Sequence, residues 1–224
     1  ARQAGVDASD MHASSRTPVP PGVDPISAAL SINQREILSV VQRIPFNERA
    51  RVVVIGSGYN GLLFSLFCKR FGAGRVALVG NPIFARLGME RYGADSFVDY
   101  KEVDTPAQVR DELGGDPTHV IDAVGSLVSL ELARLLLSPQ SAFGCYGVRD
   151  FNLSGGLRDR LSQTYPALDM ATDEAAVMDE WHQLWKEGFF AQPGMYDAVM
   201  PLEEIKAAFE ILARRQAVKI VLRI

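Results

Sequence analysis

Short apolar runs alternate with helical patterns through the middle of this 224-residue chain. The apolar runs cover residues 51–55, 75–79, 96–98, 118–121 and 142–146. Between them, apolar positions recur every three or four residues, as on one face of an amphipathic helix. Continuous apolar strands separated by helices are typical of a parallel sheet covered on both faces. With right-handed crossovers, the pattern predicts an α/β fold of the Rossmann type, a doubly wound parallel sheet with helices on both faces.

The N-terminal part of the chain has no such alternation. Residues 1–22 are small and polar and include three prolines, which predicts an extended N-terminal remnant or linker. Residues 24–44 carry apolar positions at helical spacing and are expected to form one helix, or two with a break near Asn33. The folded domain is therefore expected to span residues 23–224.

The alternation also loosens beyond Asp150. There the sequence predicts an edge strand or loop, two helices and a closing strand, in that order. Their expected ranges are 151–156, 174–187, 201–214 and 218–222.

A glycine-rich turn follows the first apolar run. Its sequence Gly-Ser-Gly-Tyr-Asn-Gly fits G-x-G-x-x-G and lies between a predicted strand and a predicted helix, which is the context that this dinucleotide-binding motif needs. The first glycine permits the tight turn, the second lets the backbone approach a pyrophosphate, and the third allows close packing of helix and strand. A glycine turn in another kind of α/β protein is the alternative. The predicted cofactor contacts of this turn are Gly56, Gly58, Tyr59, Asn60 and Gly61.

Composition and charge argue against several classes of function. The net charge of −4 provides no basic field for nucleic acid or for an anionic membrane surface. No apolar stretch reaches the roughly 18 residues that span a bilayer, and no signal pattern opens the chain, so a soluble cytoplasmic protein is expected. Cys68 and Cys145 lie in separate apolar runs and are interpreted as thiols. The chain contains neither a G-x-S-x-G elbow nor a P-loop lysine.

Several motifs occur together in one order and spacing. They are the run 51–81, Gly93-Ala94-Asp95, residues 121–126, Tyr146-Gly147-Val148, residues 201–204 and Ala217-Val218-Lys219. Over residues 17–224 this set resembles the cofactor-binding half of a medium-chain alcohol dehydrogenase or quinone reductase. The resemblance implies that Lys219 contacts the pyrophosphate. It also implies a nicotinamide side lined by Val124, Gly125, Tyr146, Gly147 and Val148.

The residue that ends the second strand indicates the cofactor type. NAD enzymes usually have Asp or Glu there, whereas this chain has Gly80 followed by Asn81. Without a carboxylate a 2′-phosphate is not repelled, Asn81 can donate to it, and Arg86 is a candidate second contact. NADP(H) is therefore favoured, and NAD(H) is not excluded.

Most of the family's substrate domain has no counterpart here. Residues 4–12 resemble that domain's active-site segment, but Asp7 stands in place of the zinc-ligand cysteine, and the deletion is expected between His12 and Thr17. Because no ligand set of three is present, no zinc is expected. The candidate polar groups near the reacting carbon are Ser9, Asp10 and Tyr146.

Two functions follow from the sequence. The first is an NADP(H)-preferring, zinc-independent oxidoreductase that acts on a small carbonyl or an activated alkene. The alternative is a non-catalytic dinucleotide-binding module, such as a redox sensor, scaffold or partner-dependent subunit. A homo-oligomer is expected, because an open sheet edge and the surfaces that the missing domain would cover favour self-association.

Overall fold

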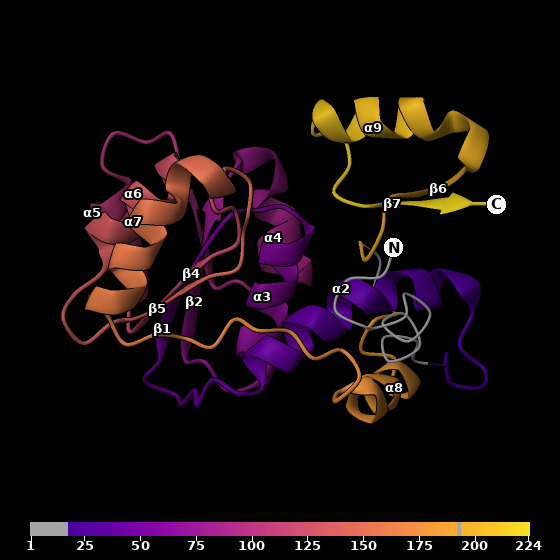
Figure 1. Cartoon of the computed structure of the whole chain (residues 1–224), viewed down its shortest axis with the longest axis horizontal. Coiled ribbons are helices and arrows are strands. Elements are labelled where there is room, and N and C mark those ends of the chain that lie inside the picture. The colour runs from indigo at the N-terminus through magenta and orange to yellow at the C-terminus, as the bar shows by residue number, and fades with distance from the viewer. Residues whose placement is uncertain (1–17, 192–193) are drawn as a thin grey trace, which may run out of the picture.

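The structure, a computed structural model, describes residues 18–191 and 194–224 (Figure 1). Helix α2 precedes the first strand and runs from Pro25 to Val41 without a break at Asn33. The strands and helices of the central part are β1 (Arg51–Ile55), α3 (Tyr59–Arg70), β2 (Arg75–Gly80), η1 (Pro82–Phe84), α4 (Ala85–Arg91), β3 (Ser96–Asp99), α5 (Thr105–Leu113), β4 (His119–Asp122), α6 (Leu127–Leu136), β5 (Ala142–Cys145) and α7 (Phe151–Thr164). Those of the last part are α8 (Met178–Lys186), β6 (Ala198–Pro201), η2 (Leu202–Glu204), α9 (Ile205–Ala213) and β7 (Ile220–Arg223).

Strands β1 to β5 form one parallel sheet in the order β3-β2-β1-β4-β5. The chain moves outward from β1 to β3 on one side and then crosses back to place β4 on the other side of β1. This reversal places the topological switch point at the carboxyl ends of the neighbouring strands β1 and β4, which is where α/β sheets bind their ligands. The predicted Rossmann-type sheet is therefore confirmed.

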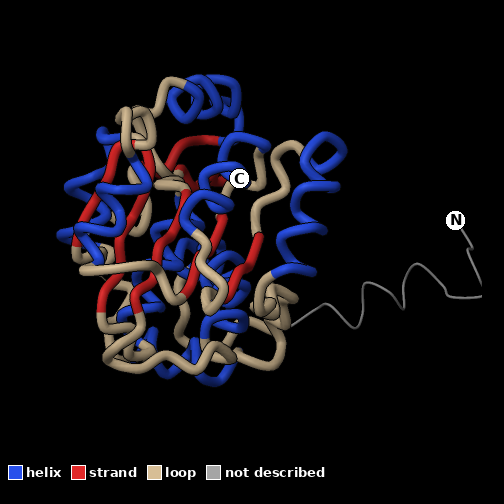
Figure 2. Tube along the Cα trace, turned by 90° about the vertical axis from the view of Figure 1, so that its left-hand side faces the viewer, coloured by secondary structure: helices blue, strands red, loops and turns tan. Residues whose placement is uncertain are grey.

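Helices cover both faces of the sheet (Figure 2), and each face has its own hydrophobic core. Alternate residues of β1 point to opposite faces, so Val52 and Val54 pack against α2, α3 and α8, whereas Val53 and Ile55 pack against α5, α6 and α7. All four are buried. Covering both faces explains why the strands are apolar without interruption.

The segment after β5 differs from its prediction. Residues 151–156, expected as an edge strand or loop, begin the helix α7, which buries Leu157 and Leu161 on the sheet. Strand-like pairing occurs later, where the backbone N–H of Phe143 donates to Pro166 and that of Leu168 donates to Phe143. The sheet edge beside β5 is thus partly covered by residues 166–168.

The chain ends in a C-terminal unit made of β6, η2, α9 and β7. Strands β6 and β7 pair in parallel with each other and not with the five-stranded sheet. Figure 1 shows this unit (yellow) beside α2 and apart from the main sheet. Pro201, the expected start of a helix, ends β6, and the α-helical turns begin four residues later. No helix within residues 18–191 and 194–224 is long and apolar enough to cross a membrane.

Candidate functional site

A cleft of about 1040 Å³ opens at the switch point of the sheet. Its floor includes Ile55 and Gly56 at the end of β1, Val79 and Gly80 at the end of β2, and Val124 after β4. The wall from the C-terminal unit consists of Leu212, Arg215, Ala217 and Val218. The cleft therefore lies where a Rossmann sheet binds its ligand, and two parts of the chain enclose it.

The glycine turn borders this cleft, and each of its three glycines has a different surrounding. A Cβ on Gly56 would lie 2.7 Å from the Val124 side chain, and φ is +116° there, so only glycine fits without strain. A Cβ on Gly61 would lie 1.8 Å from the carbonyl oxygen of Gly56, which means that helix α3 packs directly on the turn. At Gly58 nothing lies within 4 Å of such a Cβ, so the missing side chain leaves open space in the cleft.

The turn also presents a helix N-terminus. Gly58 is the N-cap of α3, and no side chain accepts a hydrogen bond from the first N–H groups of that helix. Free N–H groups and the positive end of the helix dipole suit an anion at this position. Together with the space at Gly58, this arrangement can hold a pyrophosphate.

Gly80, at the end of β2, has no room for any side chain. Its Cβ would lie 2.2 Å from Oγ of Ser57, and the same hydroxyl oxygen accepts a hydrogen bond from the backbone N–H of Asn81 at 2.9 Å. The absence of an acidic residue at position 80 is therefore tied to the presence of Ser57 in the glycine turn. Asn81 lines the cleft, and its carbonyl oxygen Oδ1 accepts from the N–H of Ile83 and caps η1.

The loops after β4 and β5 are fixed to each other by backbone contact. A Cβ on Gly125 would lie 2.0 Å from the carbonyl oxygen of Gly147, and one on Gly147 would lie 2.0 Å from the carbonyl carbon of Val124. Asp122 fixes the loop after β4, because its Oδ1 accepts from the N–H groups of Val124 and Gly125 and its Oδ2 accepts from the Ser129 hydroxyl. Burial raises the pKa of Asp122, and these hydrogen bonds act in the opposite direction.

The sequence did not single out Asp122 as a site residue. Its signal was present, since an acidic residue ends an apolar strand directly before the Val-Gly pair expected at the nicotinamide. The fully buried carboxylate positions the loop and does not line the cleft.

The predicted site residues fall into two groups. Gly56, Gly58, Gly80, Asn81 and Val124 line the cleft. The others are not among its lining residues, namely Tyr59, Asn60, Gly61, Arg86, Gly125, Tyr146, Gly147, Val148 and Lys219. Arg86 is 86% exposed and pairs with Glu90. The catalytic candidates Ser9 and Asp10 lie outside the described residues.

Tyr146 and Lys219 belong to a polar cluster that reaches Asn60 of the glycine turn and does not line the cleft. The Tyr146 hydroxyl donates to Oε2 of Glu36 at 2.9 Å, and Nζ of Lys219 donates to Oδ1 of Asn33 at 2.8 Å. The amide of Asn33 in turn reaches Glu36 and Asn60, each at 3.4 Å. Nζ of Lys219 also lies 5.0 Å from the centre of the Tyr59 ring.

Burial shapes the titration of this polar cluster. It raises the pKa of the Tyr146 hydroxyl, and the neighbouring Glu36 carboxylate adds to that shift. It lowers the pKa of Lys219, although Glu36 counteracts the effect. Tyr146 is therefore a protonated hydroxyl that is hydrogen-bonded to a carboxylate.

Two arginines in the cleft were not anticipated from the sequence. Arg149, in the loop after β5, and Arg215, in the turn after α9, are both exposed and both line the cleft. No local pattern marks either residue, because the cleft forms only when the chain folds.

The described residues offer little for a metal ion. Across residues 18–191 and 194–224, no group of three or more His, Cys, Asp or Glu side chains is placed to hold one. His119 packs against the ring of Phe46 and is hydrogen-bonded to Thr118, and His182 stacks on Trp185. Cys68 is buried and Cys145 half-buried, and both are free thiols.

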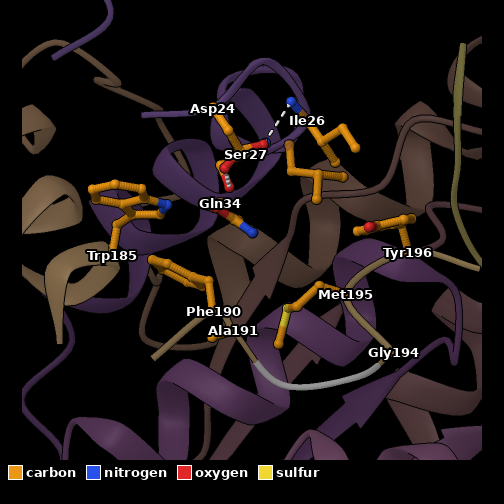
Figure 3. A pocket seen from close by; sticks show the side chains of 11 residues that line it. Asp24, Ile26, Ser27, Gln34, Trp185, Phe190, Ala191, Gly194, Met195 and Tyr196 are labelled. Atoms are coloured by element: carbon orange, nitrogen blue, oxygen red, sulfur yellow. Dashed lines mark hydrogen bonds between the residues drawn. The ribbon is translucent and has the colours of Figure 1, made fainter. Parts of the chain in front are cut away.

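A second cavity, of about 600 Å³, lies against α2 (Figure 3). Trp185 and Phe190 line one side of it, and Met195 and Tyr196 line the other. The Gln34 amide that faces it is already hydrogen-bonded to the Trp181 indole and to the Tyr59 hydroxyl. Its charged lining residue, Asp24, is an acid that caps α2, and none of its described lining residues is a cation that could pair with a phosphate group.

Comparison with known proteins identifies the fold. No protein-family model matches the sequence, and no curated protein matches it by sequence. Among solved structures, an alcohol dehydrogenase from Thermus sp. ATN1 is similar with a TM-score of 0.71 and 22% identity over 92% of this chain and 62% of that chain. A short chain alcohol dehydrogenase from E. coli CFT073, complexed with NADH, is similar with a TM-score of 0.72 and 17% identity over 93% and 62%.

A third similar structure is the 2R,3R-butanediol dehydrogenase from Bacillus subtilis, with a TM-score of 0.70 and 21% identity over 92% of this chain and 60% of that chain. This chain thus spans about three fifths of the length of the dehydrogenases that it matches. The resemblance drawn from the sequence motifs is confirmed at the level of structure, and the chain has the fold of the alcohol dehydrogenases over that part of their length.

Proposed function

We propose that this chain binds a nicotinamide dinucleotide, NADP(H) in preference to NAD(H), and serves an oxidoreductase of the alcohol dehydrogenase type. The observation that carries the proposal is the open space at Gly58, beside the uncapped N-terminus of α3 and inside the cleft at the switch point. Backbone N–H groups there can meet a pyrophosphate with no side chain between them.

The residues around the cleft fit the rest of a dinucleotide. Gly56 and Gly58 would hold the pyrophosphate, Gly80 and Asn81 the adenine ribose, and Val124, with Gly125 and Gly147 behind it, the nicotinamide side. When bound, the cofactor supplies or accepts the hydride, and the protein supplies position and electrostatics.

NADP(H) is favoured by what stands at the end of β2. Position 80 has no carboxylate to repel a 2′-phosphate, and Ser57 occupies the space that an acidic side chain would need. The Oδ1 atom of Asn81 accepts from the backbone N–H of Ile83, which leaves the donating Nδ2 end of the amide for a phosphate oxygen.

The proposed substrate is a small carbonyl compound or an activated alkene, and the proposed chemistry needs no zinc. Tyr146 remains the polar group proposed for proton handling, because its hydroxyl stays protonated and is held by Glu36. Elemental analysis of the purified protein tests the zinc proposal. About one zinc per chain would contradict it, and a chelator should leave the melting temperature unchanged.

A dinucleotide-binding module without chemistry of its own is the second candidate. One observation favours it, since Tyr146 points to Glu36 and does not line the cleft. Binding of NADPH without hydride transfer to any small carbonyl or alkene tested would support this reading over the first.

Gly58→Asp is the variant that tests dinucleotide binding. It adds a Cβ and a negative charge to open space, so NADPH binding should be lost while the melting temperature changes little. Gly155→Asp in α7 is the matched control, because its Cβ also meets nothing within 4 Å and it does not line the cleft. Fluorescence titration that gives equal NADPH affinity for wild type and Gly58→Asp would overturn the proposal.

A further inference from the structure

We propose that Arg215 binds a phosphate group of the dinucleotide from the cleft wall that the C-terminal unit contributes. The inference rests on the proposed dinucleotide binding and names a cation that neither the motif nor the resemblance assigns. Three observations support it: the positive φ of Arg215, the charged side chains that line the cleft, and the contacts that hold Lys219 outside the cleft.

The turn that ends α9 has a backbone that favours glycine. The N–H of Gln216 donates to the carbonyl of Ile211, and the N–H of Arg215 donates to that of Leu212. These two bonds define a Schellman motif, in which the residue at the position of Arg215 is left-handed and is usually glycine. Arg215 indeed has a φ of +58°.

The same motif occurs at the ends of three other helices of this chain, and each time with glycine. Gly72 after α3, Gly114 after α5 and Gly188 after α8 have φ values of +92°, +71° and +75°, and each donates to the same relative carbonyl as Arg215 does. Within residues 18–191 and 194–224, Arg215 is the one residue other than glycine with a positive φ. An arginine at a position where the backbone favours glycine indicates a functional contact of its side chain.

The charge of the cleft indicates that task. The acidic side chains that line the cleft are Glu102, Asp150 and Glu131, which pairs with Arg134, so the phosphates of a dinucleotide would need cations beside them. The cationic side chains that line it are Arg149 and Arg215. In the parts of the chain that the structure describes, Arg215 forms no ion pair, so its guanidinium is available to an anionic ligand.

Lys219 is held elsewhere in the structure. Its ammonium donates to Asn33 and lies over the Tyr59 ring, in the polar cluster outside the cleft. Moving it to a phosphate would break both contacts. Arg215 already lies on the cleft wall, and a guanidinium can donate two parallel hydrogen bonds to phosphate oxygens.

Arg215→Gly separates the binding role from the structural one. It restores the residue that the Schellman motif favours, so the melting temperature should stay equal or rise. The dissociation constant for NADPH should nevertheless increase about tenfold, as expected for the loss of a hydrogen bond to a charged group. Its dependence on salt should also become weaker, because one ion pair fewer is screened.

Arg214→Ala is the matched control. Arg214 is the adjacent residue, is exposed, lies near Glu210 at 3.9 Å and does not line the cleft. Its removal takes away the same charge and should leave the dissociation constant unchanged. Equal weakening by both variants would mean a general loss of positive charge and would overturn the role of Arg215.

Titrations with NADPH and NADH distinguish the phosphate concerned. Equal weakening for both cofactors assigns Arg215 to the pyrophosphate, whereas weakening for NADPH alone assigns it to the 2′-phosphate. Wild-type affinity of Arg215→Gly for both cofactors would overturn the inference and leave dinucleotide binding intact. If the wild-type protein itself bound neither cofactor, the proposed function would be the part that fails.

Discussion

In the five-stranded sheet every residue from Val52 to Ile55 is buried, whereas in the C-terminal unit β6 leaves Val199 and Pro201 exposed. The same contrast holds for helices, since nine of the twelve residues of α3 are buried and only Ala208 is buried in α9. The candidate cleft lies between these two regions. Its floor is therefore fixed by close packing, and its outer wall belongs to a part of the chain held by few buried side chains.

This contrast has a consequence for ligand binding. The glycine turn is closely packed, because the Val124 side chain lies against position 56 and the Gly56 carbonyl lies against position 61. The wall with Arg215 has fewer restraints, and segments with few buried apolar contacts open at lower free-energy cost. A bound dinucleotide would contact both regions and would reduce the freedom of the weaker one.

Truncation of one aromatic residue in each region should give the largest difference in stability. Phe67 on α3 is fully buried against the rings of Phe189 and Phe190, so Phe67→Ala should lower the free energy of unfolding by about 3 to 5 kcal/mol. Phe209 on α9 is 64% exposed in the single chain, so at a concentration at which the protein is monomeric Phe209→Ala should change it by less than about 0.5 kcal/mol. Urea denaturation measures both, and similar losses would show that the C-terminal unit is packed as tightly as the sheet.

The link between Ser57 and Gly80 predicts the next largest effect. Gly80→Asp alone should lower stability by about 1 to 3 kcal/mol, because its Cβ would overlap the Ser57 side chain. The double variant Ser57→Gly with Gly80→Asp removes the overlap with the Ser57 side chain, leaves the new Cβ 2.9 Å from the backbone nitrogen of residue 57, and introduces the carboxylate that binds ribose hydroxyls. It should recover part of the stability and bind NADH more tightly than NADPH.

Ser57→Gly alone is the control for this pair, and it should keep the wild-type preference between the cofactors. Thermal melting and titration with both cofactors measure the four proteins. If the double variant still preferred NADPH, position 80 would not determine cofactor choice in this chain.

Prediction from the sequence was more successful for the five-stranded sheet than for the parts of the chain around it. The strands, the glycine turn and the order of the sheet follow from local apolar runs and from glycines, whose requirements are local. Residues 151–156 begin a helix instead of a strand or loop, because the burial of Leu157 and Leu161 on the sheet outweighs an alternating pattern and the weak helix propensity of Gly155 and Gly156.

The candidate site was predictable where a motif, a strand end or the family resemblance marks it, since Gly80 and Asn81 were predicted from the end of their strand and Val124 from the resemblance. Gly56 and Gly58 were found by their motif. Arg215 was not, because the cleft wall forms from a turn more than 150 residues further along the chain. The contact between Lys219 and Asn33 spans 186 residues, and no local pattern reports such a pairing.

A smaller effect is expected from the exposed apolar side chains of the C-terminal unit. The C-terminal unit exposes Ile205, Phe209 and Leu202, and the proposed homo-oligomer would cover them. Phe209→Glu should lower the mass measured by light scattering at micromolar concentration to that of a monomer. Ile83→Glu, at an exposed apolar residue of η1, should not. A wild-type protein that is already monomeric would contradict the proposal.

The smallest expected effect concerns His119, at the start of β4 and away from the cleft. Its ring packs 5.1 Å from that of Phe46, and Nδ1 lies 2.8 Å from the Thr118 hydroxyl. Burial lowers the pKa of His119 in the folded protein. As the pH falls below about 6.5, the unfolded chain takes up the proton first, so stability should decline through this range and stay level above it.

His119→Gln removes this proton uptake and should flatten the change in unfolding free energy between about pH 5 and about pH 7.5. His182→Gln, on the surface of α8, is the control for the loss of a histidine. Urea denaturation across the pH range measures the three proteins. Because His119 lies in the closely packed sheet, an unchanged pH profile for His119→Gln would mean that even this sheet admits water at the start of β4, and the contrast between the two regions would be weaker than the burial of their side chains indicates.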